Sequence, residues 1–376
     1  MEIKWSAADT TTILQTMSYN QFEEVLLPQH LHVMEHIDYE NTTNNSIHQR
    51  LMNVMRELVD DEFDDEITFK TLVGGVTNTL FKATFKNSEG NYKSIIIRLY
   101  GKASENFIDR KQESHIQRLL SDNGVGPKFY GTFSNGCIYG FVEGDQLQLE
   151  DLESDNILNL IAMETSKWHS MALEGLKTEP TTFSYLTSWI DSTKQLLLKN
   201  SSFDCGIDID YYVKEANYLM EFLKSRYNQP HHIVFCHNDL IPRNMIYNKE
   251  KNIVKYIDFE YSGYNFRGFD LGNFFCEFSG LDLDYTRYPS VQKQKQFIRY
   301  YLKALHSLDD LSKVDETEVH QLYVEANHFT LASHLMWGFW GIISHFGSTI
   351  DFDYIDYANK RFKQYDLVKK KVYSII

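Results

Sequence analysis

The sequence predicts an α+β fold in which a small lobe, built on an antiparallel β-sheet, precedes a larger and mainly helical lobe. Short β-like segments separated by turn residues occupy residues 67–144. From about residue 145 onward, apolar residues recur at helical spacing instead. The chain has 376 residues, more than one typical compact domain, and its 43% hydrophobic and 24% charged residues are ordinary for a globular protein. We therefore expect two lobes and a sizeable core.

The small lobe is predicted to combine several strands with one helix. The β-like segments and the helical run follow in the order 71–73, 80–85, 94–100, the helix 109–121, 128–133 and 137–142. Asn135-Gly136, between the last two strands, is a strong hairpin signal. A strand, a glycine-rich turn, two strands, a helix and two further strands is the order of the small lobe in a protein-kinase-like fold. The sequence therefore predicts that two-lobed fold.

The remaining segments are expected to be mainly helical. Residues 1–66 form a polar, partly helical extension that ends in an acidic run. The apolar stretch 329–346 contains Ser333, His334 and His345, so a buried helix is favoured over a membrane span. In the large lobe, residues 145–376, helical patterns cover 211–227, 292–305, 316–345 and 354–371, with short β-like segments at 233–236 and 254–257.

Charge and cysteine content narrow the choice of partners. A formal net charge of −15 repels nucleic acid and anionic membranes and fits a cationic ligand. The four cysteines, Cys137, Cys205, Cys236 and Cys276, include no C-x-x-C pair, so neither a zinc cage nor a redox dithiol is indicated. Residues 1–12 lack the charged and apolar regions of a secretion signal. We therefore expect a cytoplasmic protein without stable membrane insertion and without a nucleic-acid partner.

The strongest chemical signal is the run C-H-N-D-L-I-P-R-N at residues 236–244, which has the form H-x-D-x-x-x-x-N. An apolar segment and then Asp258 follow it. Phosphoryl transfer needs one carboxylate to orient and deprotonate a hydroxyl, and an amide oxygen with a second carboxylate to hold Mg²⁺ over the phosphates. We predict that Asp239 is the base, that His237 braces the loop, and that Asn244 and Asp258 hold the metal. Polar turn residues between two strands are the alternative interpretation.

A second set of residues is predicted to bind nucleotide. A glycine-rich turn at the start of the small lobe would let the backbone approach a phosphate closely. Arg98, the only charge in the segment 94–100, can contact phosphates and pair with Glu113 on the following helix. The alternatives are that the glycine-rich turn is an ordinary hairpin turn and that Arg98 faces the solvent. The full predicted set is Gly74, Gly75, Val76, Thr77, Asn78, Arg98, Glu113, Phe141, Val142 and Asp258.

Together these features resemble the choline/ethanolamine kinase family over roughly residues 71–365. Arg98 in place of the protein-kinase lysine, and Glu260 where protein kinases have the glycine of Asp-Phe-Gly, are both normal for that family. The resemblance implies ATP and Mg²⁺ as cofactors and a small amino alcohol as substrate, and it suggests a homodimer. It rests on the runs 74–78, 97–101, 235–240, 257–261, 264–265, 269–273, 276–278 and 333–340.

The resemblance also implies an amine site in the large lobe, which would carry both catalysis and substrate binding, while the small lobe binds nucleotide. Ring faces attract an alkylammonium group by roughly 0.5 to 2 kcal/mol each, and a carboxylate adds to that attraction. Trp337 and Trp340, three positions apart on an apolar helix, fit ordinary core packing as well. By position, the substrate-binding residues are Asp239, Tyr261, Glu277, Trp337, Trp340 and Tyr357.

Ethanolamine is favoured over choline as the substrate. A primary ammonium donates hydrogen bonds and rewards acceptors in a small pocket, whereas a quaternary head needs a roomy aromatic box. The runs 246–248, 276–280 and 350–354 resemble the ethanolamine-preferring branch. We therefore predict phosphorylation of ethanolamine to phosphoethanolamine, the first step of the CDP-ethanolamine route to phospholipid. The alternatives are a choline kinase, an aminoglycoside-type phosphotransferase and a catalytically dead kinase-like scaffold.

Overall fold

The computed structural model describes residues 32–37, 44–60, 63, 66–72, 78–101, 109–348 and 350–375. It divides into a first compact unit, Met1–Tyr100 with Phe129–Phe141, and a second, Gly101–Lys128 with Val142–Ile376. The predicted glycine-rich turn at residues 74–77 lies outside the described residues. The predicted lobe boundaries after residues 66 and 144 remain predictions.

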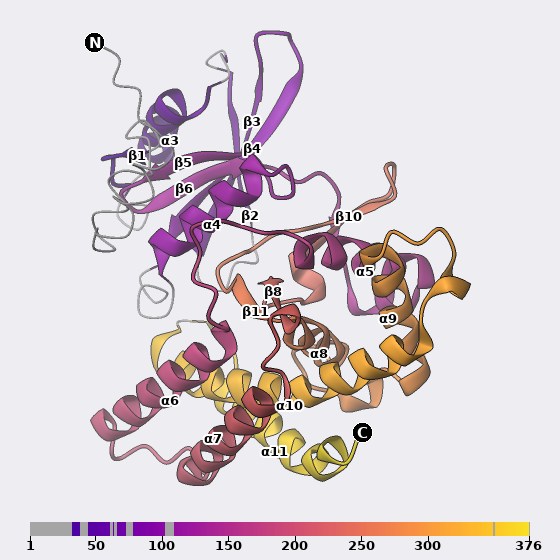
Figure 1. Ribbon diagram of the computed structural model, residues 1–376. Helices are drawn as coiled ribbons and strands as arrows, with labels where there is room; N and C mark the ends of the chain where they lie inside the picture. Colours follow the sequence, from indigo (N-terminus) through magenta and orange to yellow (C-terminus); the bar gives the residue numbers. More distant parts are fainter. Residues whose placement is uncertain are drawn as a thin grey trace, which may run out of the picture. The chain divides into compact units, whose positions relative to one another are not determined.

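The first unit is built on a six-stranded sheet with the order β1-β5-β6-β4-β3-β2 (Figure 1). Its strands are β1 (His32–Val33), β2 (Thr68–Leu72), β3 (Asn78–Lys86), β4 (Tyr92–Tyr100), β5 (Phe129–Phe133) and β6 (Gly136–Gly140). Every neighbouring pair is antiparallel except β1 with β5, which is parallel. The predicted antiparallel sheet is confirmed, and the short parallel edge strand is an addition to it. Local alternation could not reveal β1, because its partner lies about a hundred residues further along the chain.

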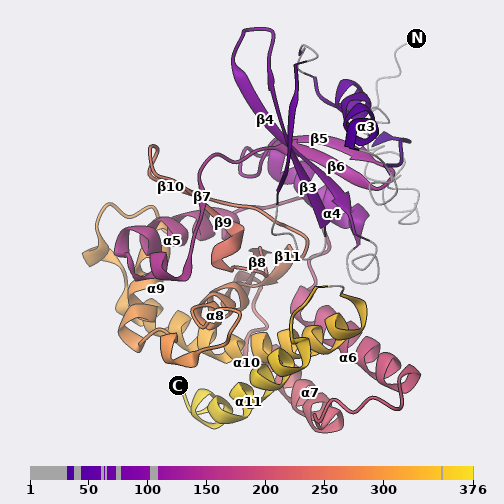
Figure 2. The ribbon, with the colours of Figure 1, turned by 180° about the vertical axis from the view of Figure 1, so that it is seen from behind.

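The helix α3 (Asn44–Leu58) covers part of this sheet, and Figures 1 and 2 both show it beside β5. Its buried residues Leu51, Val54, Met55 and Leu58 recur three or four positions apart, which places them on one face of the helix. They share a core cluster with alternating residues of β3 and β4. Part of the segment predicted as an extension is therefore packed into the first unit's core.

The turn between β5 and β6 shows why a glycine follows Asn135. A Cβ atom on Gly136 would lie 2.2 Å from the backbone oxygen of Arg98 on β4, so a larger residue would push the strands apart. The Asn135 side chain binds both backbone polar groups of Ile37, accepting from the N–H and donating to the oxygen at 2.9 Å each. The hairpin is thus tied to the chain segment that follows β1.

The second unit is mainly helical, which confirms the predicted fold class. Two small antiparallel sheets, β10-β9-β7 and β11-β8, interrupt the helices. The strands are β7 (Asp145–Gln146), β8 (Ile233–Cys236), β9 (Met245–Asn248), β10 (Ile253–Tyr256) and β11 (Gly263–Phe266). The helices are α4 (Arg110–Asp122), α5 (Asp155–His169), α6 (Thr181–Lys199), α7 (Ile209–Arg226), α8 (Arg267–Glu277), α9 (Val291–Leu305), α10 (Glu316–Gly347) and α11 (Tyr354–Tyr373). Short 3₁₀ turns are η3 (Leu149–Glu153), η4 (Pro230–His232), η5 (Pro242–Asn244), η6 (Tyr285–Arg287) and η7 (Leu311–Lys313).

The 32-residue helix α10 is the central element of the second unit and packs against α6, α8, α9 and α11. Nearly all of its residues after Val319 are buried, so the apolar stretch 329–346 is the predicted buried helix. Within the described residues, no helix combines the length and the apolar character needed to cross a membrane. Figure 1 shows α8 and α11 beside α10, so these contacts bring together segments that are far apart in the sequence.

Candidate active site

The predicted catalytic loop connects β8 to β9, and β11 and β10 hold these strands by antiparallel pairing. At its start, the buried imidazole of His237 spans two backbone groups. Nε2–H donates to the Ile257 oxygen at 3.0 Å, and Nδ1 accepts from the Asp239 N–H at 3.3 Å. These partners define the neutral Nε2–H tautomer, and burial lowers the pKa of His237, which favours the same neutral form. The ring therefore links the loop to the segment that precedes Asp258.

Asn238 holds the loop in its tight conformation. Its φ of 68° lies in the left-handed region, which asparagine tolerates better than most residues. The Asn238 amide donates to the backbone oxygen of Tyr261 at 2.8 Å and to Thr181 Oγ1 at 3.0 Å. Its oxygen accepts from Asn265 at 2.7 Å. With its side-chain hydrogen bonds supplied by Thr181, Tyr261 and Asn265, Asn238 turns the backbone sharply and presents the next residue, Asp239.

Asp239 and Asn244 are hydrogen-bonded to each other. The Asn244 side-chain amide donates to Asp239 Oδ2 at 2.8 Å and to the Asp239 backbone oxygen at 3.0 Å. Burial raises the pKa of Asp239 well above its ordinary value, and the charges of Glu277, Asp258 and Glu260 raise it further, while the Asn244 hydrogen bond lowers it. The carboxylate is thus oriented by an amide and placed where taking up a proton is favourable.

Asp258 lies next to this pair. The Ile257 N–H donates to the Asn244 backbone oxygen at 2.9 Å, which joins the end of the loop to the residue before Asp258. Asp258 itself has a φ of 65°, a conformation that costs energy for a residue with a Cβ and that often occurs at functional sites. Its carboxylate gathers with those of Glu113 and Glu260, with oxygen atoms within 4.8 Å of one another. Arg110 offsets this negative charge, with Nη1 2.7 Å from Glu113 and 3.8 Å from Glu260.

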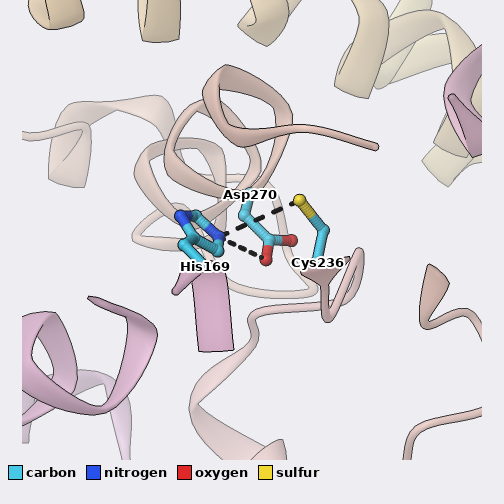
Figure 3. Close-up of side chains that lie close together, drawn as sticks. All are labelled: His169, Cys236 and Asp270. Carbon is cyan, nitrogen blue, oxygen red and sulfur yellow. Dashed lines mark hydrogen bonds and ion pairs between the residues drawn. The ribbon is translucent and has the colours of Figure 1, made fainter. Parts of the chain in front are cut away.

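Another carboxylate, Asp270 on α8, holds the start of the loop. Its two oxygens accept from the backbone N–H groups of His237 at 2.8 Å and Asn238 at 2.6 Å. Figure 3 shows His169 and Cys236 beside it, with His169 Nε2 3.2 Å from Asp270 and 3.9 Å from the Cys236 sulfur. These three side chains have the residue types of a metal site. However, the loop already uses both carboxylate oxygens, and burial raises the pKa of the Cys236 thiol, so the cluster is a brace for the backbone.

The rings predicted to bind the amine form an edge-to-face series in the second unit. Ring centroids are 5.4 Å apart for Tyr261 and Trp337, 5.7 Å for Trp337 and Trp340, and 6.0 Å for Trp340 and Tyr357. Trp340 is half-buried and the other three are buried. Trp189 of α6 joins the series, 5.9 Å from Trp337. Edge-to-face contact is a favourable arrangement for aromatic pairs.

Two polar side chains set the orientation of this series. Asn273 on α8 accepts through Oδ1 from the Trp337 indole N–H and from the Ser333 hydroxyl, both at 2.8 Å. Arg361 on α11 donates to the Tyr357 hydroxyl at 3.0 Å and to Glu277. Glu277 is therefore not a lone carboxylate facing the substrate, because a buried cation already shares its charge.

The predicted nucleotide-binding residues divide between the two units. Residues 74–77 lie outside the described residues, and Asn78 begins β3. Arg98 is buried in β4, and the Phe141 ring lies 3.5 Å from Lys82 Nζ, as in a cation–π contact. Val142, Glu113 and Asp258 belong to the second unit. The pairing of Arg98 with Glu113 therefore remains a prediction.

Sequence reasoning missed four residues that contact the predicted site. Trp189, Asp270, Asn273 and Arg361 each bind a predicted residue or the backbone beside it. Asp270 and Asn273 stand within the quoted run 269–273, so that run carried the signal without indicating what its members contact. Trp189 and Arg361 lie on amphipathic helices, where nothing in the local pattern distinguishes them from ordinary core or surface residues.

Comparison with known proteins identifies the family. A family model described as choline/ethanolamine kinase matches residues 69–366. The chain belongs to the choline/ethanolamine kinase family. This kinase is 49% identical to the probable ethanolamine kinase B of Dictyostelium discoideum, over 95% of this chain and 100% of that protein.

Solved structures show the same likeness. The kinase resembles a choline kinase from Cryptosporidium parvum, with a TM-score of 0.73 and 28% identity, over 86% of this chain and 96% of that one. It resembles a Plasmodium vivax ethanolamine kinase with a TM-score of 0.73 and 25% identity, over 93% of this chain and 95% of that one. An aminoglycoside phosphotransferase shares its fold, with a TM-score of 0.51 at 14% identity, over 85% of this chain and 97% of that one.

Proposed function

We propose that this kinase transfers the γ-phosphate of ATP to the hydroxyl of ethanolamine and so supplies phosphoethanolamine to the CDP-ethanolamine route to phospholipid. The observation that carries the proposal is the contact of Asn244 with Asp239 beside Asp258, in a member of a family of small-alcohol kinases. The choice of ethanolamine is supported by the 49% identical relative, which is named an ethanolamine kinase.

Asp239 acts as the general base in this proposal. Because Asn244 occupies Oδ2, Oδ1 is the oxygen that would accept the proton of the substrate hydroxyl. The raised pKa of Asp239 helps proton transfer, since a stronger base takes up the hydroxyl proton more readily. The substrate oxygen then forms a bond to the γ-phosphorus as the bond to ADP breaks, and the proton stays on Asp239 until the product leaves. His237 and Asp270 keep the loop backbone in place during this step.

The residues present fit a magnesium ion. The Asn244 amide nitrogen donates to Asp239, and its oxygen accepts no hydrogen bond from the residues that the structure describes. Asp258 adds a carboxylate next to it. Amide and carboxylate oxygens are ligands that Mg²⁺ prefers. When bound, the ion would neutralise charge on the phosphates of ATP. We propose Asn244 and Asp258 as its ligands.

The residues proposed to bind the nucleotide are those that the sequence predicted. Arg98, a buried cation on a central strand, suits a phosphate contact because a planar guanidinium can donate two parallel hydrogen bonds to phosphate oxygens. We propose that residues 74–77 contact the phosphates and that Phe141 and Val142 belong to the nucleotide-binding set. Asn78 and Glu113 complete this set.

The amine end is proposed to lie along the ring series, with Glu277 supplying charge. Tyr261, Trp337, Trp340 and Tyr357 offer ring faces to an ammonium group, which each contact stabilises by roughly 0.5 to 2 kcal/mol. Negative charge from Glu277 reaches both Asp239 and Tyr357, since it raises the pKa of each. The charge of Glu277 therefore acts on both the proposed general base and a ring of the proposed ammonium site.

Steady-state kinetics with ethanolamine, its N-methylated derivatives and choline tests this function. We expect the highest kcat/KM for ethanolamine and a decline as methyl groups replace N–H donors. A higher kcat/KM for choline would make this kinase a choline kinase. Turnover of an aminoglycoside, with no turnover of any amino alcohol, would overturn the proposal.

Two further points are proposals that come from the sequence. We propose a homodimer, which the family resemblance suggests, and a cytoplasmic location. Sedimentation of the purified chain at several concentrations would test the first, and imaging of the tagged full-length chain in cells would test the second.

A further inference from the structure

Arg361 is a buried cation that contacts two of the residues proposed to bind the amine. It is 1% exposed and lies on α11. Its Nη2 donates to Glu277 Oε1 at 2.5 Å, and its Nε donates to the Tyr357 hydroxyl at 3.0 Å. A single guanidinium therefore joins a carboxylate at the end of α8 to a ring on α11.

Burying the ion pair of Arg361 with Glu277 costs free energy, because both charges lose their contact with water. Within the described residues, Arg361 is the one ion-pair partner of Glu277, which is 5% exposed. The Arg361 Nη1 atom makes no hydrogen bond in the part of the chain that the structure describes. A buried ion pair with an unsatisfied donor is a poor way to stabilise a fold, and well-packed apolar residues often do as well or better. The position of this arginine therefore points to a role in binding or catalysis.

The two partners of Arg361 both interact electrostatically with the proposed general base, Asp239. After burial, the charge of Glu277 does most to raise the pKa of Asp239, and the charge of Asp239 adds to the burial that raises the pKa of Tyr357. Within the described residues, Glu277 uses Oε1 for Arg361 and makes no hydrogen bond through Oε2. One carboxylate oxygen is thus occupied and the other is available to a donor.

We propose that Arg361 is a positioning residue for the ammonium end of the substrate. By occupying Oε1 of Glu277, it leaves Oε2 to accept an ammonium N–H. By holding the Tyr357 hydroxyl, it fixes the ring against which the ammonium packs. Arg361 acts only through Glu277 and Tyr357. The arrangement favours a substrate whose ammonium group can donate a hydrogen bond. This inference rests on the proposed function.

The first test replaces Arg361 by lysine and measures KM and kcat for each substrate. Arg361→Lys keeps the positive charge but loses the planar fork that reaches two acceptors at once. We expect KM for ethanolamine to rise roughly 10- to 100-fold, the range that a lost charged hydrogen bond allows. KM for ATP should change little. KM for choline, which has no N–H, should rise less, so the preference for ethanolamine should shrink.

A second test asks whether Arg361 acts through Glu277. The variants are Glu277→Gln, Arg361→Met and the combination of both, which removes the ion pair without leaving an unpaired buried charge. We expect the double variant to bind ethanolamine no more weakly than Glu277→Gln alone. The double variant also decides the question if Arg361→Lys does not fold. Additive increases in KM would overturn the inference.

Lys360→Met is the matched control, because Lys360 is the neighbouring cation on α11 and pairs with Asp356 at the surface. Its kinetics should match those of the wild type. If the wild type acts on ethanolamine while Arg361→Lys keeps a normal KM and preference, the inference fails and the proposed function stands. Equal losses for ATP and ethanolamine would also overturn it, because they would indicate general structural damage. A wild type inactive on every amino alcohol would overturn the proposed function and this inference together.

Discussion

Asn244 donates two hydrogen bonds to Asp239, one to the backbone oxygen at 3.0 Å and one to Oδ2 at 2.8 Å. These contacts close the loop of residues 239–244 on itself. They also assign different tasks to the two ends of the Asn244 amide, because the nitrogen orients the proposed base while the oxygen stays available to a cation. The proposed base and the proposed metal ligand are thus mechanically coupled.

Replacing Asp239 by alanine should lower kcat by about 100- to 10,000-fold, the usual contribution of a positioned general base. ATP binding should stay close to that of the wild type, because Asp239 is proposed to touch the alcohol and not the nucleotide. Kinetics and calorimetric titration with ATP would measure both quantities. Asp309→Ala, an exposed aspartate paired with Lys313, is the control and should behave as the wild type. Normal turnover of Asp239→Ala would remove Asp239 from the mechanism.

Replacing Asp258 by asparagine should increase the magnesium concentration needed for half-maximal activity and lower kcat. The reason is that an amide binds a divalent cation more weakly than a carboxylate does, so the phosphates of ATP lose counter-charge. A magnesium titration at saturating ATP and ethanolamine would check this. An unchanged midpoint would show that Asp258 is not a ligand.

Replacing Asp270 by asparagine should lower kcat by about 10-fold or more, since a hydrogen bond to a charged group contributes about 1.5 to 3 kcal/mol. The Asp270 carboxylate accepts hydrogen bonds from two backbone N–H groups. An asparagine has only one oxygen, so its NH₂ group would face one of these donors and that hydrogen bond would be lost. Cys236→Ala is the control in the same cluster, because the contacts of this sulfur are 3.6 Å or longer. If Cys236→Ala and Asp270→Asn lost activity equally, the cluster would have a role beyond bracing the loop.

Acid should destabilise the fold through His328 on α10. Burial lowers the pKa of His328 to about 4, and the Tyr227 hydroxyl lies 2.5 Å from Nδ1. The unfolded chain takes up this proton near the ordinary histidine pKa of about 6.5. Between that pH and about 4 the unfolded state binds more protons than the folded state. The free energy of unfolding therefore decreases as the pH is lowered through this range, and at pH 5 the decrease is about 2 kcal/mol.

Urea unfolding of the wild type and of His328→Gln at pH 7.5 and pH 5.0 would measure this loss. The variant should lose less stability on acidification than the wild type. An identical pH dependence in wild type and His328→Gln would contradict the assignment. His237 and His334, whose pKa values burial also lowers, would keep part of the dependence in every variant.

Local patterns predicted the elements well where the residues that make an element are close in sequence. The alternation of β3 and the three- to four-residue spacing along α9 are such patterns, because side chains repeat with the period of the backbone. The order of residues 237–244 is another, since the turn brings Asp239 and Asn244 together within one loop. The roles of these residues stay predictions, but their proximity follows from short-range geometry.

Contacts between distant residues could not be predicted in the same way. The parallel strand β1 pairs with a strand about a hundred residues later. Asp270 reaches a loop 33 positions before it, and Arg361 reaches Glu277 across 84 positions. The run 269–273 singled out Asp270 without indicating its partner, and the local surroundings of Arg361 resemble those of many other charged residues on amphipathic helices. Asp270 and Arg361 reach these partners because α8 and α11 both pack against the central helix α10.

The sequence by itself determined that this protein has a sheet-containing unit and a helical unit, and it predicted that one short loop carries the chemistry of phosphoryl transfer. Periodicity and short-range turns encode those features. Only the tertiary structure decided that Glu277 shares its charge with Arg361 and that Asp270 grips the loop backbone. The physical reason is that the charge state and orientation of a buried side chain depend on which groups surround it, and those groups come from helices far apart in the chain.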